Sequence, residues 1–440
     1  MMASLRDGPA VPGSLRQMNR LTILRLLREI GPTTKPALAR QSGISRPTTS
    51  KVVDDLEASR LAERIGMTQP ASNGGKPGAI YRFNAGGVRS GAVFLRVDAV
   101  QVAIIDGNGH VHARLDHPLG SDRHPEPVID LIVTTLKDLL AQLGLMADDL
   151  LGVGIGVPGL TSFHKGIVHF APHLPDWRDV PLSEMVAAAL GTQVWVDNDC
   201  HVQALAERHF GIGQTGRSGA NGCEFVSVQS GIGLSAAFYL DGALYRGPGD
   251  TAGEIGHMTV QEQGLLCDCG NRGCWETVAS ITWLVGEACR TSDGTFQMPQ
   301  WLNVSAMVDH SFHNIRDVAP AIITSCAHAI FCAARAGNPE ADALVRRHAS
   351  HFGVGLANLI NMLNPQRIII WGDSVAGGEV FLETVRKVVG ERALMRAREN
   401  CEIVFTQLDH DVGLIGAGSL ALDALFDGLS LESPASRQMV

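Results

Sequence analysis

The sequence predicts an α/β protein that follows a small, mainly helical N-terminal domain. Three observations lead to this prediction: charge is divided unevenly along the chain, strand and helix patterns alternate from residue 91 onward, and three cysteines crowd into eight residues. A chain of 440 residues is too long for one small core and suggests two or three folding units. Its 45 % apolar residues can fill a large interior.

The first 90 residues are basic, and the rest of the chain is acidic. Residues 1–90 contain 14 Lys or Arg and 6 Asp or Glu, whereas the remainder contains 22 and 39. The basic segment suits a polyanion, and the acidic body suits a neutral or small ligand. From charge alone, a merely solvated charged face is the alternative interpretation.

The chain has no sign of a membrane segment or an export signal. No run of about 18 apolar residues occurs. The first residues also lack the apolar stretch of a signal peptide. We therefore expect a cytoplasmic protein with no membrane partner. The nine cysteines, an odd number, argue against a disulfide framework.

The order of elements over residues 1–83 is that of a winged helix-turn-helix. Three helices are expected first, at 15–30, 35–41 and 45–59. Thr34 and Ser45 can cap the second and third helices. Two short strands are expected at 61–65 and 79–83, around a glycine-rich tip that would form the wing.

The third helix is the candidate DNA-reading element. In winged helix-turn-helix domains this helix enters the major groove, and its N-terminal side chains meet base edges. Compact helical domains with a hairpin also occur without DNA binding, but the basic charge of this segment favours it. The candidate DNA-binding residues are Arg46, Thr48, Thr49, Ser50, Lys51 and, in the wing, Lys76.

Beyond a short link at residues 84–90, alternating strands and helices indicate sheets covered by helices. Strands are expected at 92–97, 102–105, 151–157, 193–196, 224–228, 232–240 and 367–371. Helices are expected at 127–143, 181–190, 277–291, 317–336 and 339–363. The stretch 292–316 has no clear pattern.

The strongest local signal is one histidine followed by a cysteine-rich loop. His257, Cys267, Cys269 and Cys274 offer one imidazole and three thiolates. Zinc prefers four such ligands in a tetrahedron, and four protein ligands leave no open position, so we expect a structural zinc ion. Three thiols without a metal are the alternative.

Polar residues also gather around glycine-rich turns and predicted strand ends, where open α/β sheets bind ligands. They are Asn198, Asp199, Glu254 and Glu276. Carboxylates accept strong hydrogen bonds from the hydroxyl groups of neutral polyols. Scattered acidic residues are more often solvated surface.

Five segments together resemble the ROK family, which contains repressors and sugar kinases. They are GVGIGVPGL, APHLPDWRDVPL, VDNDCHVQALAE, GDTAGEIGHMTV and CDCGNRGCWE. The similarity extends over residues 91–425, and the preceding segment resembles the winged helix of the family's regulators, including its SNGGKP wing. The resemblance implies a two-lobed, actin-like (ribonuclease H-like) sugar-kinase fold. Its first lobe would be 91–199 completed by a C-terminal helix at about 412–428, and its second lobe 200–411 with the zinc loop.

The resemblance also implies a sugar pocket between the lobes. The residues carried over to it are Gly159, Asn198, Asp199, Glu254, His257 and Glu276. In the family, His257 would both ligate zinc and face the sugar. Asp199 matches the general base of the family's kinases. Here it need only accept a hydrogen bond.

The phosphate-binding loops of the family's kinases are altered in this chain. The first, usually DxGxT, reads Val97-Asp98-Ala99-Val100-Gln101, and the second, usually GTG, reads Gln229-Ser230-Gly231. A third glycine-rich segment reads Trp371-Gly372-Asp373. Phosphoryl transfer depends almost entirely on positioning and electrostatics, so we expect no enzyme activity.

These features predict a sugar-responsive DNA-binding transcriptional regulator, a repressor of carbohydrate genes. Its partners would be double-stranded operator DNA and a sugar or sugar phosphate. The family resemblance implies a homodimer or a dimer of dimers. The alternative is an ATP-dependent sugar kinase that also binds DNA.

Overall fold

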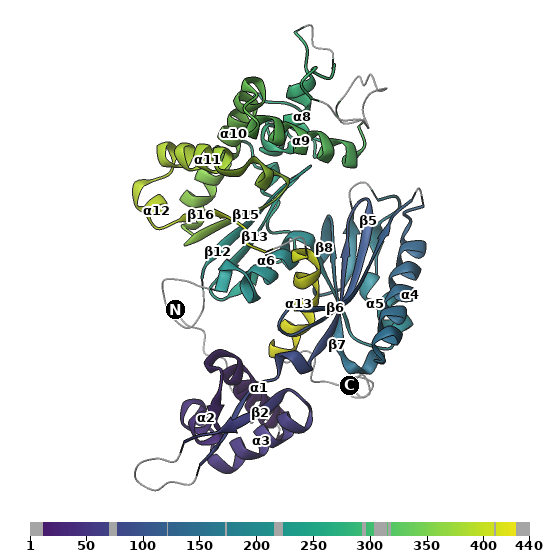
Figure 1. The fold of residues 1–440 in the computed structure, drawn as a ribbon, viewed down its shortest axis with the longest axis vertical. Helices are drawn as coiled ribbons and strands as arrows, with labels where there is room; N and C mark the ends of the chain where they lie inside the picture. The colour runs from purple at the N-terminus through teal and green to yellow at the C-terminus, as the bar shows by residue number, and fades with distance from the viewer. Residues whose placement is uncertain are drawn as a thin grey trace.

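The computed structural model describes residues 12–69, 77–120, 122–171, 174–214, 223–292, 296–302, 315, 318–408 and 411–427. A small N-terminal domain lies below an α/β body built from two five-stranded sheets (Figure 1). The predicted fold class is confirmed in this respect. Among the described residues, no helix is both long and apolar enough to cross a membrane.

The N-terminal domain contains the predicted helices and strands in the predicted order, with one strand, β1, in addition. These are α1 (Pro12–Ile30), β1 (Thr33–Thr34), α2 (Lys35–Ser42), α3 (Arg46–Ala58), β2 (Ala62–Met67) and β3 (Ala79–Phe83). The strands form a sheet in the order β1-β3-β2. Both predicted caps are present, because the Thr34 side chain accepts from the Ala37 amide and the Ser45 side chain from the Thr48 amide.

The first large sheet has the strand order β11-β7-β4-β5-β6. Its strands are β4 (Arg89–Leu95), β5 (Ala99–Asp106), β6 (Val111–Pro118), β7 (Leu150–Val157) and β11 (Val194–Asn198). Helices α4 (Pro125–Leu143) and α5 (Leu182–Leu190) cover one face. Alternate residues of β4 point to opposite faces of the sheet. Val93 therefore packs in the core beneath α4 and α5, whereas Ala92 faces the C-terminal helix α13 (Val412–Asp427). A small antiparallel sheet adjoins it, formed by β8 (Leu160–Ser162), β9 (Ile167–Phe170) and β10 (Arg178–Val180).

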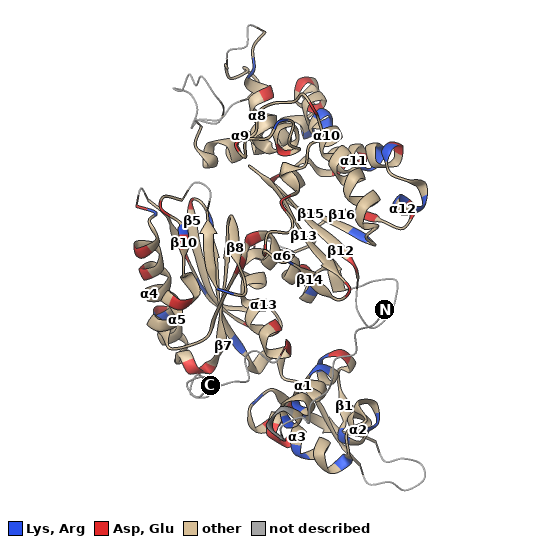
Figure 2. Cartoon of the chain, turned by 180° about the vertical axis from the view of Figure 1, so that it is seen from behind, with Lys and Arg blue, Asp and Glu red and all other residues tan. Residues whose placement is uncertain are grey.

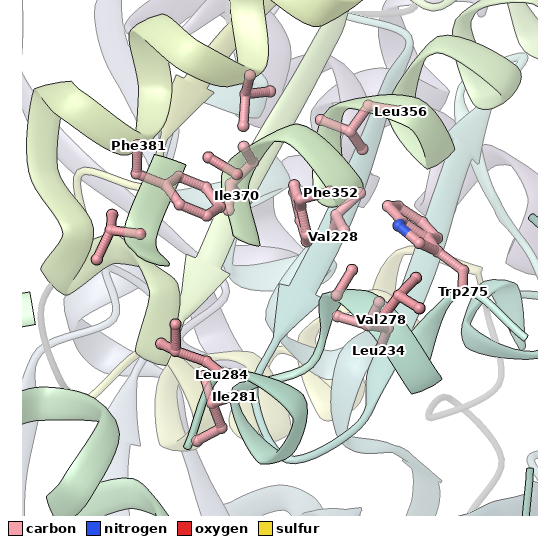
Figure 3. Packing of buried hydrophobic residues seen from close by; sticks show 14 of the residues in the cluster. Val228, Leu234, Trp275, Val278, Ile281, Leu284, Phe352, Leu356, Ile370 and Phe381 are labelled. Atoms are coloured by element: carbon pink, nitrogen blue, oxygen red, sulfur yellow. The ribbon is translucent and has the colours of Figure 1, made fainter. Parts of the chain in front are cut away.

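The second large sheet has the order β14-β13-β12-β15-β16. Its strands are β12 (Phe225–Ser230), β13 (Leu234–Leu240), β14 (Ala243–Tyr245), β15 (Arg367–Gly372) and β16 (Glu402–Phe405). Its helices are α7 (Glu276–Ala279), α8 (Ile281–Cys289), α9 (Pro320–Arg335), α10 (Pro339–Leu363), α11 (Gly378–Arg392) and α12 (Met395–Glu399). The core beneath them is mostly aliphatic and contains a row of aromatic rings, with Trp275 and Phe381 on either side of Phe352 (Figure 3).

Helix α6 (Asp199–His209) lies between the two large sheets (Figure 1). Cys200 and Ala204 pack on the second sheet, against residues such as Ile369. Val202 and Leu205 pack on the opposite side against Leu420 of α13. Helix α6 is therefore in contact with the second sheet and with α13 at once.

Helix α13 approaches its neighbours at backbone distance. A Cβ atom at Gly154 of β7 would overlap the carbonyl oxygen of Ala417, and one at Gly416 would overlap that of Val202 in α6. At its far end, α13 enters the core of the N-terminal domain. The residues that share this core include Leu24, Leu27, Val53 and Leu56 of the domain, with Leu422, Leu425 and Phe426 of α13.

The predicted helix at 277–291 is wrong as a single element. Helices α7 and α8 are separate, because Ser280 has an extended backbone and its side chain caps α8 by accepting from the Trp283 amide. Several elements were not predicted, namely β1, β6, β8, β9, β10, β14, β16, α6, α11 and α12.

Candidate functional site

The predicted sugar-site residues begin where β11 ends and α6 starts. Asn198 is the N-cap of α6, and its Oδ1 accepts from the Cys200 amide at 2.8 Å. Its Nδ2 donates to the carbonyl oxygen of Gly159 at 2.9 Å. Gly159 has a φ of 96°, which favours glycine. These bonds fix the loop after β7 against the start of α6 and place Asp199 in its first turn.

A pocket opens at this point between the two parts of the α/β body. Its lining residues are Gly159, Leu160, Asn198, His201, Ser235, Ala236, Asp250, Thr251, Ala252, Gly253 and Glu254. Three predicted residues, Gly159, Asn198 and Glu254, are among them. Sequence reasoning missed the polar side chains of His201, Ser235, Asp250 and Thr251. His201 follows Asn198 by three residues, so helical periodicity could have indicated it.

Two carboxylates at this site are costly to ionise: Glu254, which lines the pocket, and Asp199, which lies in the first turn of α6 and is not among the described lining residues. Burial raises the pKa of Asp199 to about 6, and the nearby charge of Glu254 raises it further than burial alone would. Burial likewise raises the pKa of Glu254, with Glu276 acting in the same direction and His257 against it. Because these carboxylates are costly to ionise, hydrogen-bond donors such as sugar hydroxyls stabilise their charged form strongly.

A buried ionic network lies beneath the pocket and joins its two walls. Asp197 of β11 accepts two hydrogen bonds from the Arg246 guanidinium, at 2.9 and 2.7 Å. It also lies 2.8 Å from His201 Nδ1, while His201 Nε2 lies 3.3 Å from the Ala252 carbonyl oxygen. Although burial opposes it, the charges of His201 and Arg246 hold the pKa of Asp197 below its usual range. The loop that carries Glu254 is thus anchored to the first sheet.

A second contact between the same walls involves Asp250. Its carboxylate accepts from the Ser162 hydroxyl at 2.9 Å and lies 3.1 Å from His164 Nδ1. Asp250 has a φ of 55°, a conformation that aspartate tolerates better than most residues. Both networks hold the loop from Arg246 to Glu254 against the first part of the body.

The predicted residues His257 and Glu276 lie beyond the pocket lining and connect it to the cysteine-rich loop. His257 Nε2 lies 4.0 Å from a Glu254 carboxylate oxygen. His257 Nδ1 faces the other way, 3.5 Å from Glu276 Oε1 and 3.5 Å from Cys267 Sγ. One imidazole therefore has the pocket carboxylate on one side and the thiols on the other.

His257, Cys267, Cys269 and Cys274 form a cluster that could bind a metal ion. Their ligand atoms all lie within 4.8 Å of one another. The Sγ atoms of Cys269 and Cys274 are 3.6 Å apart, close to the edge of about 3.8 Å expected in a tetrahedron with Zn–S bonds of about 2.3 Å. The Asn271 amide donates to Cys274 Sγ at 3.3 Å, a contact that suits a thiolate.

The cluster is attached directly to the core of the second sheet. Trp275 follows the last cysteine and is fully buried. Its ring faces that of Phe352 (Figure 3), at 5.3 Å between the ring centroids. Its Nε1 donates to the His351 carbonyl oxygen at 3.0 Å. The loop geometry is thereby coupled to the packing of α10.

The candidate DNA-binding residues divide into three groups. Arg46 and Lys51 are exposed on α3, where basic side chains also extend over α1 and α2 (Figure 2). Thr48 and Ser50 are partly buried and engaged, since Thr48 bonds Ser45 and Ser50 lies 3.2 Å from Lys35 Nζ.

Thr49 corrects the prediction that this part of α3 is exposed throughout. Its side chain is fully buried and turned toward the domain core, on the same stripe as Val52, Val53 and Leu56. It cannot reach a base edge from there. Lys76 lies outside the described residues.

The second and third of the altered phosphate loops meet in the structure. The Asp373 carboxylate lies 3.2 Å from the position that a Cβ atom of Gly231 would occupy. Ser230 is buried and bonds Ser374 at 2.6 Å. In the first loop, the Asp98 carboxylate accepts from Arg96 at 3.1 Å. Burial raises the pKa of Asp373, and the charge of Arg96 acts against this rise.

Comparisons with known proteins agree with this architecture. Residues 90–424 match the ROK family, and residues 17–69 match the MarR family. The xylose repressor of Caldicellulosiruptor bescii is 26 % identical over 412 residues, which cover 93 % of this chain and 96 % of the relative. The glucokinase of Streptomyces coelicolor is 31 % identical over 324 residues, which cover 73 % of this chain and 94 % of the kinase.

Among solved structures, a ROK family transcriptional regulator described as a homologue of the Escherichia coli MLC protein has the same fold. It superposes with a TM-score of 0.76 at 23 % identity, covering 95 % of this chain and 98 % of that one. The match over residues 90–424 accounts for most of the chain. The protein therefore belongs to the ROK family and carries a MarR-type winged helix-turn-helix in front of its ROK domain.

Proposed function

We propose that this protein is a sugar-responsive DNA-binding transcriptional repressor. The observation that carries the proposal is that one chain combines a basic winged helix with a carboxylate-lined pocket. The winged helix shares a hydrophobic core with α13 of the body that contains the pocket. The xylose repressor that aligns with 93 % of the chain supports the same function. Two winged helices brought together in a homodimer would match a palindromic operator.

The pocket favours a neutral aldose over a sugar phosphate. The described residues of its lining include the carboxylates of Asp250 and Glu254 and no Lys or Arg. Carboxylates accept hydrogen bonds from sugar hydroxyls and repel phosphate. We therefore assign the effector to the unphosphorylated pentoses and hexoses. Asp199, at the start of α6, would accept one of these hydroxyl bonds.

The second candidate function is sugar phosphorylation, which the 31 % identity to a glucokinase favours. Asp373 argues against kinase activity. Its carboxylate lies where the loops at 229–231 and 371–373 meet, and both loops would have to receive phosphates. We expect no phosphate transfer when the protein is incubated with D-glucose or D-xylose and γ-labelled ATP. Labelled sugar phosphate formed at a rate of about 1 per second or more, the lower end of ordinary enzyme turnover, would establish a kinase instead.

We assign the cysteine cluster to structural zinc, held by His257 Nδ1 and the thiolates of Cys267, Cys269 and Cys274. Zinc would neutralise these thiolates and hold the loop closed. The distances between ligand atoms support a tetrahedral site. Because Nδ1 would bind the metal, Nε2 would stay turned toward Glu254 and the sugar.

The zinc assignment predicts one zinc ion per chain after purification without added metal. Cys274→Ser should lose most of this zinc and lower the melting temperature, because three ligands hold the ion poorly. Elemental analysis and thermal unfolding measure both effects. Cys332→Ser is the control, since Cys332 is exposed and distant in sequence from the loop. Folded wild-type protein that lacks zinc would disprove the assignment.

The DNA assignment predicts that Arg46→Ala with Lys51→Ala weakens binding to a duplex selected from a random-sequence pool. If both side chains meet phosphates, the slope of log affinity against log salt should also flatten by about 2. Titrations by fluorescence anisotropy at several salt concentrations measure this. The control is Lys387→Ala, an exposed lysine on α11. An unchanged affinity and slope in the double variant would contradict the assignment.

The pocket assignment predicts that Glu254→Ala abolishes the sugar response while DNA binding without sugar survives. A ligand that binds only the folded state raises the free energy of unfolding, by about 2.7 kcal/mol at a ligand concentration of 100 times Kd. The melting temperature rises as a consequence. We expect D-xylose, D-glucose or N-acetyl-D-mannosamine to produce such a rise in the wild type and in Glu262→Ala, an exposed carboxylate outside the pocket. If Glu254→Ala responds at the same sugar concentration, the pocket is misplaced.

A further inference from the structure

Three helices from different parts of the chain meet at one partly buried cluster. His209, the last residue of α6, lies between Arg28 of α1 and Asp423 of α13. Its side chain is only 5 % exposed. No sequence motif marks these residues, and none of them lines the sugar pocket.

The hydrogen bonds in this cluster have a defined direction. His209 Nε2 lies 2.6 Å from an Asp423 carboxylate oxygen, which can only accept, and Nδ1 faces the Arg28 guanidinium, which can only donate. The imidazole is therefore neutral, with its proton on Nε2. This agrees with burial, which lowers the pKa of His209 despite the opposing charge of Asp423.

Arg28 connects this cluster to the core of the DNA-binding domain. Its guanidinium lies 4.3 Å from the ring centroid of Phe426, a distance typical of a cation–π contact. Phe426 is itself part of the hydrophobic core that the winged helix shares with α13. The position of α1 therefore depends on where the end of α6 holds Arg28.

The other end of α6 lies at the sugar pocket. Asn198 caps the helix and lines the pocket, and Asp199 occupies its first turn. The 11 residues of α6 span about 16 Å as one continuous helix. A displacement at its first turn is therefore carried to His209 at its last.

We propose that α6 transmits sugar occupancy to the DNA-binding domain through His209, which positions Arg28 of α1 against Asp423 of α13. The proposal rests on the proposed function, because it requires sugar to bind at Asp199 and Glu254. Asn198, beside Asp199 at the start of α6, and Glu254 both line the pocket, so a sugar that bonds Asp199 and Glu254 changes the relation of α6 to the loop that carries Glu254. Since α13 meets both β7 and α6 at backbone distance, a displacement of α6 is taken up as a step of these packed helices, and the His209 cluster passes that step to Arg28 of α1.

This mechanism needs only a small difference in free energy between two arrangements. Coupling between two sites is typically about 1–3 kcal/mol, or about 5- to 150-fold in affinity. The cluster is suited to such a role, because directional hydrogen bonds around a nearly buried imidazole fit one arrangement well and a shifted one poorly.

The test compares variants that cut the cluster with one that leaves it intact. His209→Leu removes both hydrogen bonds, and Arg28→Met removes only the α1 end while keeping an apolar side chain against Phe426. His209→Gln keeps one donor and one acceptor and should rescue the response in part. The matched control is Arg25→Ala, since Arg25 also lies on α1 and bonds the Phe426 carbonyl oxygen at 2.8 Å without contacting α6.

Two affinities are measured for each full-length variant: that for D-xylose or D-glucose by calorimetry, and that for the selected duplex with and without the sugar. In the wild type and Arg25→Ala, sugar should change DNA affinity by at least about 5-fold. In His209→Leu and Arg28→Met the change should fall below about 2-fold, while the sugar Kd and the sugar-free DNA Kd stay within about 3-fold of wild type. His209→Gln should lie between these limits.

Each remaining outcome has a distinct meaning. Full coupling in folded His209→Leu or Arg28→Met overturns the proposal and leaves the repressor function intact. If Arg25→Ala loses the effect of sugar on DNA affinity to the same extent, the proposal is also overturned. Any disturbance of the α1–α13 contact would then be enough to abolish the coupling. If His209→Leu does not fold, Arg28→Met and His209→Gln decide alone. A wild type that binds sugar without any change in DNA affinity refutes the proposed function itself.

Discussion

The close packing of α13 against β7 and α6 is the constraint on which the arrangement of the chain depends. Gly154 and Gly416 allow backbone to meet backbone there, and any side chain would force the elements apart. Interiors packed at this density do not deform gradually, so neighbouring elements shift between discrete positions. Because α13 also completes the core of the winged helix, the placement of the DNA-binding domain follows from the same contacts.

The candidate pocket depends on its surroundings in a similar way. Glu254 lies on a loop that Arg246 ties to β11 of the first sheet and Asp250 ties to β8 of the small adjoining sheet, and His257 stands between that loop and the cysteine cluster. The carboxylates are thus held in place by two buried networks and, in the proposed zinc-bound form, by the metal loop as well. Such support favours selective recognition, because groups already oriented for a ligand lose little entropy on binding it.

The sequence predicted those parts that repeat in a regular pattern or a compact motif. The caps Thr34 and Ser45 locate α2 and α3, and the cysteine spacing locates the metal cluster. The burial of Thr49 was available from its spacing to Val52, Val53 and Leu56, but the polarity of threonine concealed it. The contacts of His209 with Arg28 and Asp423 were not available, because residues separated by up to about 400 positions meet only through the tertiary packing of α1, α6 and α13.

The shared core at α13 also bears on how such proteins can be recombined. Leu422, Leu425 and Phe426 fill the interior of a domain that begins some 400 residues earlier, so the first domain is not an independent module on a tether. A chimera that grafts another winged helix onto this body would leave these three side chains without their partners. A chimera that exchanges operator specificity between relatives therefore has to take the last two turns of α13 from the same protein as the winged helix-turn-helix domain.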